Sequence, residues 1–168
     1  EHPETFKDGD VVSIDLVIDY EGMVLDSART VGCGTLSSDA RELMNVTKAA
    51  LTAAIKAAAP GNRVRDIGQA VVDAVPEGYG IVDALCGHGV GYDVHEEPQV
   101  PNIPMKGESP LLEPGMVLAI EPMIIAGKKD VIFDERDGYT VLSADGNLAA
   151  HMEHTVLITK KGPEVLTR

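Results

Sequence analysis

Cysteine is scarce in this sequence, and basic residues and long apolar runs are scarce as well. The two cysteines, Cys33 and Cys86, are too few for a disulfide framework, which favours a reducing cytoplasm over secretion. Lysine and arginine total 14 against 27 aspartates and glutamates, whereas a nucleic-acid-binding surface is basic. No apolar run approaches the ~20 residues of a membrane-spanning helix, and no charged-then-apolar leader opens the chain. We therefore expect a cytoplasmic protein with no nucleic-acid partner and no membrane partner.

Length and composition are those of an ordinary globular protein. The 168 residues suit a single domain over 1–168 that buries roughly 70% of its unfolded surface. We expect most of the charged side chains behind the formal net charge of −13 to lie on the solvated surface, and bound cations would offset part of that charge. Because the chain opens at Glu1 rather than at a methionine, we expect that something precedes it in the native protein or that it was clipped.

A β-hairpin is predicted at the start of the chain. The residues from Val11 onward alternate between two faces, and Glu21-Gly22 reads as a two-residue turn before a returning strand over 23–28. In this register Asp15 and Asp26 become diagonal neighbours on one face, with Cα atoms about 7–8 Å apart, close enough to meet around cations. The alternative is that both carboxylates point to solvent. The two faces are Val12, Ile14, Leu16, Ile18 and Val11, Ser13, Asp15, Val17, Asp19.

The rest of the chain mixes helices and strands. A capping box of Asp39 and Glu42 predicts a helix over 39–59, and an apolar stripe predicts a second helix over 64–75. Both stripes are expected to be core. Strands are expected over 79–85, 115–125, 139–142 and 151–159, with an edge or bulge at Glu121-Pro122, and a proline-rich loop over 101–114 is expected to wall a cleft.

The stretch CGHGVGYDVHEEPQV, residues 86–100, has the strongest chemical signal. Imidazole is a common ligand of transition metals, and it stands here at His88 and His95. The glycines beside His88 are expected to let the backbone approach whatever that histidine holds. Taken alone, the stretch fits a turn with a hydrogen-bonded histidine better than it fits a metal site.

Four carboxylates in apolar surroundings favour the metal-site reading. Asp15, Asp26, Glu121 and Glu153 each interrupt an apolar segment, where an unpaired carboxylate is costly. With His88 they form a hard-to-borderline ligand set that suits Mn, Fe(II), Co or Zn. Five side chains are too many for one catalytic ion that keeps a water, and they suit two ions about 3.5–4 Å apart, as in phosphatases, nucleases and aminopeptidases. His95 would then be a spare imidazole able to donate to a substrate carbonyl. A structural metal site is a weaker alternative, because such sites favour closed Cys/His sets.

Four stretches resemble a known family. SIDLVIDYEGMVLDSART, CGHGVGYDVHEEPQVPN, GMVLAIEPMI and DGYTVLSADGNLAAHMEHTVLIT, in that order, closely resemble the type I methionine aminopeptidases. The resemblance implies an α/β (α+β) pita-bread fold with a mostly antiparallel curved sheet and helices on its outer face. It implies that two divalent cations (Co, Mn, Fe, Zn or Ni) are bound by Asp15, Asp26, His88, Glu121 and Glu153. It also implies that His95 contacts the scissile peptide, that Glu121 shuttles a proton, and that initiator methionine is removed from peptides and nascent proteins.

Two competing interpretations and one departure accompany the resemblance. X-Pro peptidases share the fold and a similar histidine motif, and some pita-bread proteins are binding modules without hydrolysis, although all five ligands are present here. Relative to the family, the chain lacks an N-terminal segment that carries a second substrate-contacting histidine, and His2 is not assigned to that role because its spacing differs. We therefore expect the chain to associate with another copy or with a complementing N-terminal segment, and to cleave slowly alone.

Overall fold

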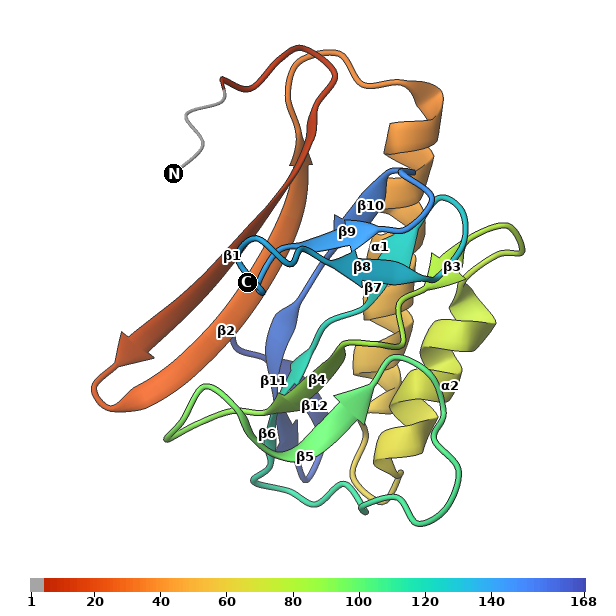
Figure 1. The fold of residues 1–168 in the computed structure, drawn as a ribbon. Helices are drawn as coiled ribbons and strands as arrows, with labels where there is room; N and C mark the ends of the chain where they lie inside the picture. Colours follow the sequence, from red (N-terminus) through yellow and green to blue (C-terminus); the bar gives the residue numbers. More distant parts are fainter. Residues whose placement is uncertain (1–4) are drawn as a thin grey trace.

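The computed structural model describes residues 5–168, so His2 lies outside the described residues. The fold is α+β, and every strand pairing in the described part is antiparallel, as predicted (Figure 1). The helices are α1 (Ser38–Ala57) and α2 (Val64–Ala74). The strands are β1 (Val11–Tyr20), β2 (Met23–Gly32), β3 (Gly80–Ile81), β4 (Cys86–Gly89), β5 (Glu96–Pro101), β6 (Val117–Ile120), β7 (Met123–Ile125), β8 (Val131–Phe133), β9 (Val141–Ser143), β10 (Ala149–His151), β11 (His154–Thr159) and β12 (Gly162–Val165).

The β1–β2 hairpin has the register that the sequence predicts. Asp15 pairs with Ala28 and Val17 with Asp26, which makes the two aspartates diagonal neighbours. The turn residues Glu21 and Gly22 both have positive φ, at 54° and 83°, as a tight two-residue hairpin turn requires. The returning strand β2 runs to Gly32, beyond the predicted residue 28.

Two predicted strands are interrupted at carboxylates. The expected strand 115–125 is split into β6 and β7 by Glu121-Pro122, because proline has no N–H for the ladder. The expected strand 151–159 is split into β10 and β11 at Met152-Glu153. β6 and β11 belong to a five-stranded sheet of order β12-β11-β6-β4-β5, and β7 and β10 to a three-stranded sheet of order β10-β7-β3. Each carboxylate therefore stands where the chain passes from one sheet to the other.

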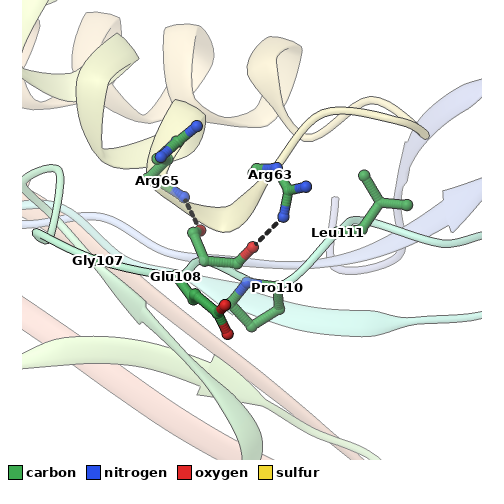
Figure 2. Close-up of a pocket in the computed structure, with 7 residues that line it drawn as sticks. Arg63, Arg65, Gly107, Glu108, Pro110 and Leu111 are labelled. Atoms are coloured by element: carbon green, nitrogen blue, oxygen red, sulfur yellow. Dashed lines mark hydrogen bonds between the residues drawn. The ribbon is translucent and has the colours of Figure 1, made fainter.

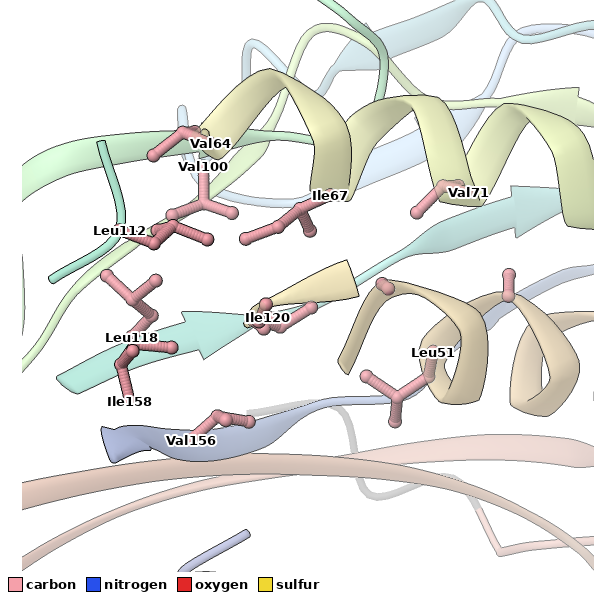
Figure 3. Packing of buried hydrophobic residues seen from close by; sticks show 13 residues of the cluster. Leu51, Val64, Ile67, Val71, Val100, Leu112, Leu118, Ile120, Val156 and Ile158 are labelled. Atoms are coloured by element: carbon pink, nitrogen blue, oxygen red, sulfur yellow. The ribbon is translucent and has the colours of Figure 1, made fainter. Parts of the chain in front are cut away.

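The main apolar core lies between the helices and the five-stranded sheet (Figure 3). Both helices contribute their predicted apolar stripes to buried clusters. The side chains labelled in Figure 3 are Leu51, Val64, Ile67, Val71, Val100, Leu112, Leu118, Ile120, Val156 and Ile158. These contacts fix β6 and β11, which adjoin Glu121 and Glu153, and β5, which pairs with the strand β4 that carries His88.

Several sequence expectations need correction. The cap of α1 is Ser37, whose hydroxyl accepts from the N–H of Ala40 at 3.1 Å, whereas Asp39 lies in the first turn. The expected strand 79–85 is reduced to two residues, and 139–142 shifts to β9, which pairs with the unpredicted β8. β5 and β12 were not expected either, because β5 is largely polar and β12 begins at Gly162-Pro163.

The hairpin and the helices lie on opposite sides of the central strands (Figure 1). The hairpin face that carries the aspartates turns toward β10 and β11, where Asp26 is buried. Its other face is open, with Ile14 and Leu16 each 55% exposed and Ile18 48% exposed. Among the described residues, no helix is both long and apolar enough to cross a membrane.

Candidate metal centre

Three buried side chains meet where the hairpin packs against the central strands. Asp26 lies on β2, His88 on β4, and Glu153 at the break between β10 and β11. One donor atom from each lies within 4.8 Å of the others. Asp26 is 6% exposed, His88 7% and Glu153 2%. A carboxylate–imidazole–carboxylate set of this size is suited to a divalent transition metal.

The orientation of His88 is fixed by its own strand. Its Nδ1 lies 2.8 Å from the carbonyl oxygen of Gly89, and because a carbonyl only accepts, Nδ1 carries the proton. Nε2 is then the lone-pair nitrogen, and it lies 3.8 Å from Oδ2 of Asp26 and 3.5 Å from Oε1 of Glu121. An imidazole held at one nitrogen and facing carboxylates with the other is typical of a metal ligand.

The remaining two predicted carboxylates adjoin this group. Glu121 is 8% exposed, and its carbonyl oxygen accepts from the side-chain amide of Asn102 at 3.2 Å, which holds the strand break in place. Asp15 lies at the rim, with 57% of its side chain exposed. It is close enough for its charge to act on both Asp26 and Glu153. The structure thus brings all five predicted residues together, four of them buried.

The carboxylates destabilise one another in the metal-free chain. Burial, followed by the charges of Glu121, Asp26 and Asp15, raises the pKa of Glu153 to about 9. Burial and the charge of Asp15 likewise raise the pKa of Asp26, against a smaller lowering by His88. In addition, Oδ1 of Asp26 and Oε1 of Glu153 are buried without a hydrogen bond. Divalent cations would relieve the repulsion and satisfy these oxygens, so the residues present fit the metal.

His95 lies beside this group. Its ring centroid is 4.4 Å from that of His88, with an angle of 67° between the ring planes. The described contacts include no ion pair between His95 and a candidate ligand. This position suits a group that faces a substrate next to the metal centre.

Two glycines of the histidine stretch lie at close contacts between strands. A Cβ at Gly87 would clash with the carbonyl of Ala119, and a Cβ at Gly89 with the carbonyl of Glu97. Both glycines therefore allow the backbones of β4, β5 and β6 to approach closely. That the glycines also let the backbone approach whatever His88 holds stays a prediction.

Sequence reasoning missed three residues around the centre. Nε2 of His151 lies 3.3 Å from Oε2 of Glu121. Thr155 and Thr30 bind the backbones of Asp26 and His151. A polar residue at every second position before and after Glu153 was the available signal, since His151, Glu153 and Thr155 share one side of the chain where it meets the hairpin.

A wide cavity lies away from the candidate centre. It measures about 810 Å³ and is formed by the start of α2 and the loop 107–111 (Figure 2). The guanidinium of Arg63 donates to the carbonyl oxygen of Ser109 at 2.6 Å, and the hydroxyl of Ser109 accepts from the N–H of Arg65 at 2.8 Å. None of the candidate ligands lines this cavity, and its arginine contacts fasten the loop to the helix.

Comparisons with known proteins agree with this chemistry. The model of metallopeptidase family M24 matches residues 1–160. A methionine aminopeptidase of Aquifex aeolicus is 48% identical over 168 residues, which cover 98% of this chain and 64% of that protein. The crystal structure of methionine aminopeptidase from Rickettsia prowazekii has a TM-score of 0.96 and 34% identity, over 99% of this chain and 68% of its own. Prolidase from Pyrococcus furiosus has a TM-score of 0.79 and 28% identity, over 99% of this chain and 44% of its own.

These matches settle the fold and leave part of the relatives unmatched. The methionine aminopeptidase and prolidase structures are pita-bread proteins, which confirms the predicted fold class. The chain spans slightly less than two thirds of the length of the first curated relatives that it matches.

Proposed function

The chain belongs to metallopeptidase family M24, and from this premise we propose that it is an aminopeptidase that removes N-terminal methionine from peptides and nascent proteins. The observation that carries the proposal is the convergence of Asp26, His88 and Glu153 on one buried point, with donor atoms within 4.8 Å of one another. The preference for methionine rests on the relatives, which are named methionine aminopeptidases at 38–48% identity. In this proposal residues 1–168 act as one catalytic domain.

We assign two divalent cations to the centre. Asp15, Asp26, His88, Glu121 and Glu153 are the proposed ligands, and the cations are Co, Mn, Fe, Zn or Ni. Two ions suit five side chains of which four are carboxylates, because bridging carboxylates share their charge between them. In such sites two cations acidify a water and polarise the carbonyl under attack.

The protein's own groups supply the remaining chemistry. Glu121 takes up and returns the proton during hydrolysis, since its carboxylate is buried in the centre with Oε1 3.5 Å from Nε2 of His88. His95 donates to the substrate carbonyl and its developing oxyanion, because it stands next to His88 without a carboxylate partner of its own among the described ion pairs.

An apolar cavity adjoins the centre on the side of β7 and β10. It measures about 160 Å³, and His151, which contacts Glu121, is part of its wall. An unbranched apolar side chain such as that of methionine suits a cavity of this character. Its lining residues are Ser13, Val82, Leu85, Met123, Ile125, Val131, Val141, Leu142, Ser143, Ala149, Ala150 and His151.

A peptide assay with added metal tests the proposal. We expect release of methionine from a Met-Ala-Ser peptide in the presence of Co(II) or Mn(II), and loss of that activity with a chelator. Cleavage of a peptide with proline second and another residue first, in preference to Met-Ala-Ser, would instead support the X-Pro alternative, whose structural representative is the prolidase match. Tight metal binding without any hydrolysis would support a binding module.

Location and partners complete the proposal. We place the protein in the cytoplasm, because Cys33 and Cys86 are both free thiols. Its partner is the N-terminus of a peptide or nascent protein. We further propose that the open hairpin face around Ile14, Leu16 and Ile18 is covered by polypeptide equivalent to the part of the relatives outside the match.

A further inference from the structure

His151 contacts the metal centre, although neither the ligand set nor the proposed chemistry includes it. It is the last residue of β10, two positions before Glu153. Its Nε2 lies 3.3 Å from Oε2 of Glu121, and its Nδ1 lies 4.0 Å from Oδ2 of Asp15. Nε2 is buried and has no hydrogen bond of regular geometry, which is costly for a polar atom.

The backbone of His151 is held firmly. The hydroxyl of Thr30 donates to the carbonyl oxygen of His151 at 2.6 Å, and it accepts from the N–H of the same residue at 2.8 Å. Thr30 is itself 1% exposed, and Ser13 contacts its hydroxyl at 2.8 Å. A side chain that starts from a backbone fixed on both sides has little freedom to leave the centre.

Glu121 lies between two imidazoles. Its Oε1 faces Nε2 of His88 at 3.5 Å, and its Oε2 faces Nε2 of His151 at 3.3 Å. His88 keeps its proton on Nδ1, so it offers a lone pair on the Oε1 side. The Oε2 side therefore needs a donor, because a carboxylate that binds a metal through one oxygen is usually hydrogen-bonded at the other.

We propose that His151 is a positioning residue that donates from Nε2 to Oε2 of Glu121 and so keeps Oε1 directed at His88 and the metals. The inference rests on the proposed function, because it takes Glu121 as a metal ligand. A neutral imidazole has one N–H, and the nearer carboxylate oxygen is that of Glu121 at 3.3 Å, just beyond the usual N–H···O range of roughly 2.7–3.2 Å, so that a small rotation of either side chain closes the bond. Asp15, at 4.0 Å, lies much farther outside this range.

Donation and direct ligation make different demands on the side chain. A glutamine amide also donates a hydrogen bond but is a poor ligand for a transition metal. His151→Gln therefore keeps the proposed role, and His151→Ala removes it. Loss of such a partner of a ligand costs about 10–100-fold in metal affinity.

The experiment measures Co(II) binding by calorimetry, together with the visible absorption of the Co(II) protein. We expect His151→Ala to weaken the binding of at least one ion by about 10–100-fold and to shift the absorption bands, because the carboxylate of Glu121 reorients. His151→Gln should bind within a few-fold of the unmodified chain and restore its spectrum. The matched control is His154→Ala, whose ring turns away to the hydroxyl of Thr167 at 3.0 Å, and it should leave the affinity unchanged.

The outcomes separate this inference from the proposed function. Circular dichroism of each metal-free variant establishes that it is folded. Equal affinity and spectra in His151→Ala and the unmodified chain would overturn the positioning role. Equal losses in His151→Ala and His151→Gln would overturn it as well, in favour of direct ligation. If the unmodified chain binds no Co(II), it is the proposed function that fails.

Discussion

The hydroxyl of Thr155 binds both backbone groups of Asp26, donating to its carbonyl oxygen at 2.7 Å and accepting from its N–H at 2.9 Å. The two residues are 129 positions apart, and Thr155 is fully buried. Thr30 binds the backbone of His151 in the same manner. Two hydroxyls thus replace strand-to-strand hydrogen bonds and fasten the hairpin to the central strands at the candidate metal centre.

Removal of the Thr155 hydroxyl is expected to loosen this junction. Thr155→Val keeps the shape of the side chain but leaves a buried N–H and a buried carbonyl without partners, which costs about 1–3 kcal/mol of stability. Because Asp26 then moves more freely, metal affinity should fall as well. Urea unfolding of the metal-free protein and calorimetry with Mn(II) measure the two effects.

The control for this prediction is Thr47→Val. Thr47 is also fully buried, but its hydroxyl donates to the carbonyl of Leu43 within α1. It should lose stability without losing metal affinity. Equal metal affinity in Thr155→Val and the unmodified protein would show that the hydroxyl does not position Asp26.

Substitution of a proposed ligand should remove one ion. Asp15→Asn and Glu153→Gln each take away one anionic donor, so binding of the second ion and most of the activity should be lost while the fold persists. Metal content after dialysis, measured by atomic emission, and circular dichroism are the readouts. Two ions bound at unmodified affinity in either variant would contradict the ligand assignment.

The stability of the metal-free protein should fall as the pH rises. An unfolded glutamate has a pKa of ~4.3, and burial with like charges raises the pKa of Glu153 to about 9 in the folded chain. The folded state therefore holds this proton more tightly. The stabilisation is complete below the unfolded pKa and is lost progressively up to the folded pKa, and the raised pKa of Asp26 acts in the same direction.

Urea unfolding of the metal-free protein at several pH values across this window measures the slope. In Glu153→Gln the slope should be shallower, because glutamine has no proton to lose. Since Glu153 is protonated at neutral pH in the metal-free chain, metal binding there should also release a proton, which calorimetry in buffers of different ionisation enthalpy detects. An unchanged slope in the variant would mean that Glu153 is not the group responsible.

His95 should affect the rate and not the metals. It stands beside His88 and outside the proposed ligand set, so His95→Ala is expected to keep its metal content and to lose about 10²–10³ in kcat, the usual effect of losing one transition-state donor. Metal analysis and steady-state kinetics on a Met-Ala-Ser peptide check the two parts. Loss of metal would identify His95 as a ligand instead.

The sequence predicts those features of the fold that local rules determine. The register of the hairpin follows from alternation and a two-residue turn, so the diagonal placement of Asp15 and Asp26 is confirmed. The buried carboxylates are recognisable because each one interrupts an apolar segment. The strand breaks at Glu121 and Glu153 are harder to predict from the sequence, because a bend of the chain between two sheets depends on both sheets.

Contacts between distant segments have no such local signal. Thr155 and Asp26 reveal nothing of their contact in the sequence, because an isolated threonine in a strand is commonplace. His151 alternates with Glu153 and Thr155 in the sequence, but this pattern does not identify its partner, and only the packing of β10 against the hairpin brings it to Glu121. Alternation also predicts two faces of the hairpin without showing which one is covered. The apolar face proves to be the open one.

This open face leads to a prediction about assembly. The side chains of Ile14, Leu16 and Ile18 are about half exposed, and they line a groove of about 480 Å³ together with the last three residues, 166–168. A contiguous apolar surface of a few hundred Å² is typical of an interaction site. The helices α1 and α2 lie on the other side of the central strands, so they do not cover it (Figure 1).

We expect that a peptide equivalent to the unmatched part of the Aquifex aeolicus relative binds this face and raises the rate of methionine release, because covering the outer face steadies the hairpin that carries Asp15 and Asp26. Sedimentation at low micromolar concentration and the peptide assay, each with and without that segment, are the measurements. Leu16→Lys should abolish the binding, since a buried ammonium without a partner is costly. Val72→Lys, a change at an exposed apolar residue of α2, should leave the binding intact.

A dimer that forms through the same face and excludes the segment would identify a second copy as the occupant. A monodisperse monomer of 17.8 kDa with full activity and no response to the segment would show that the face needs no cover, and that the substrate site is complete without it.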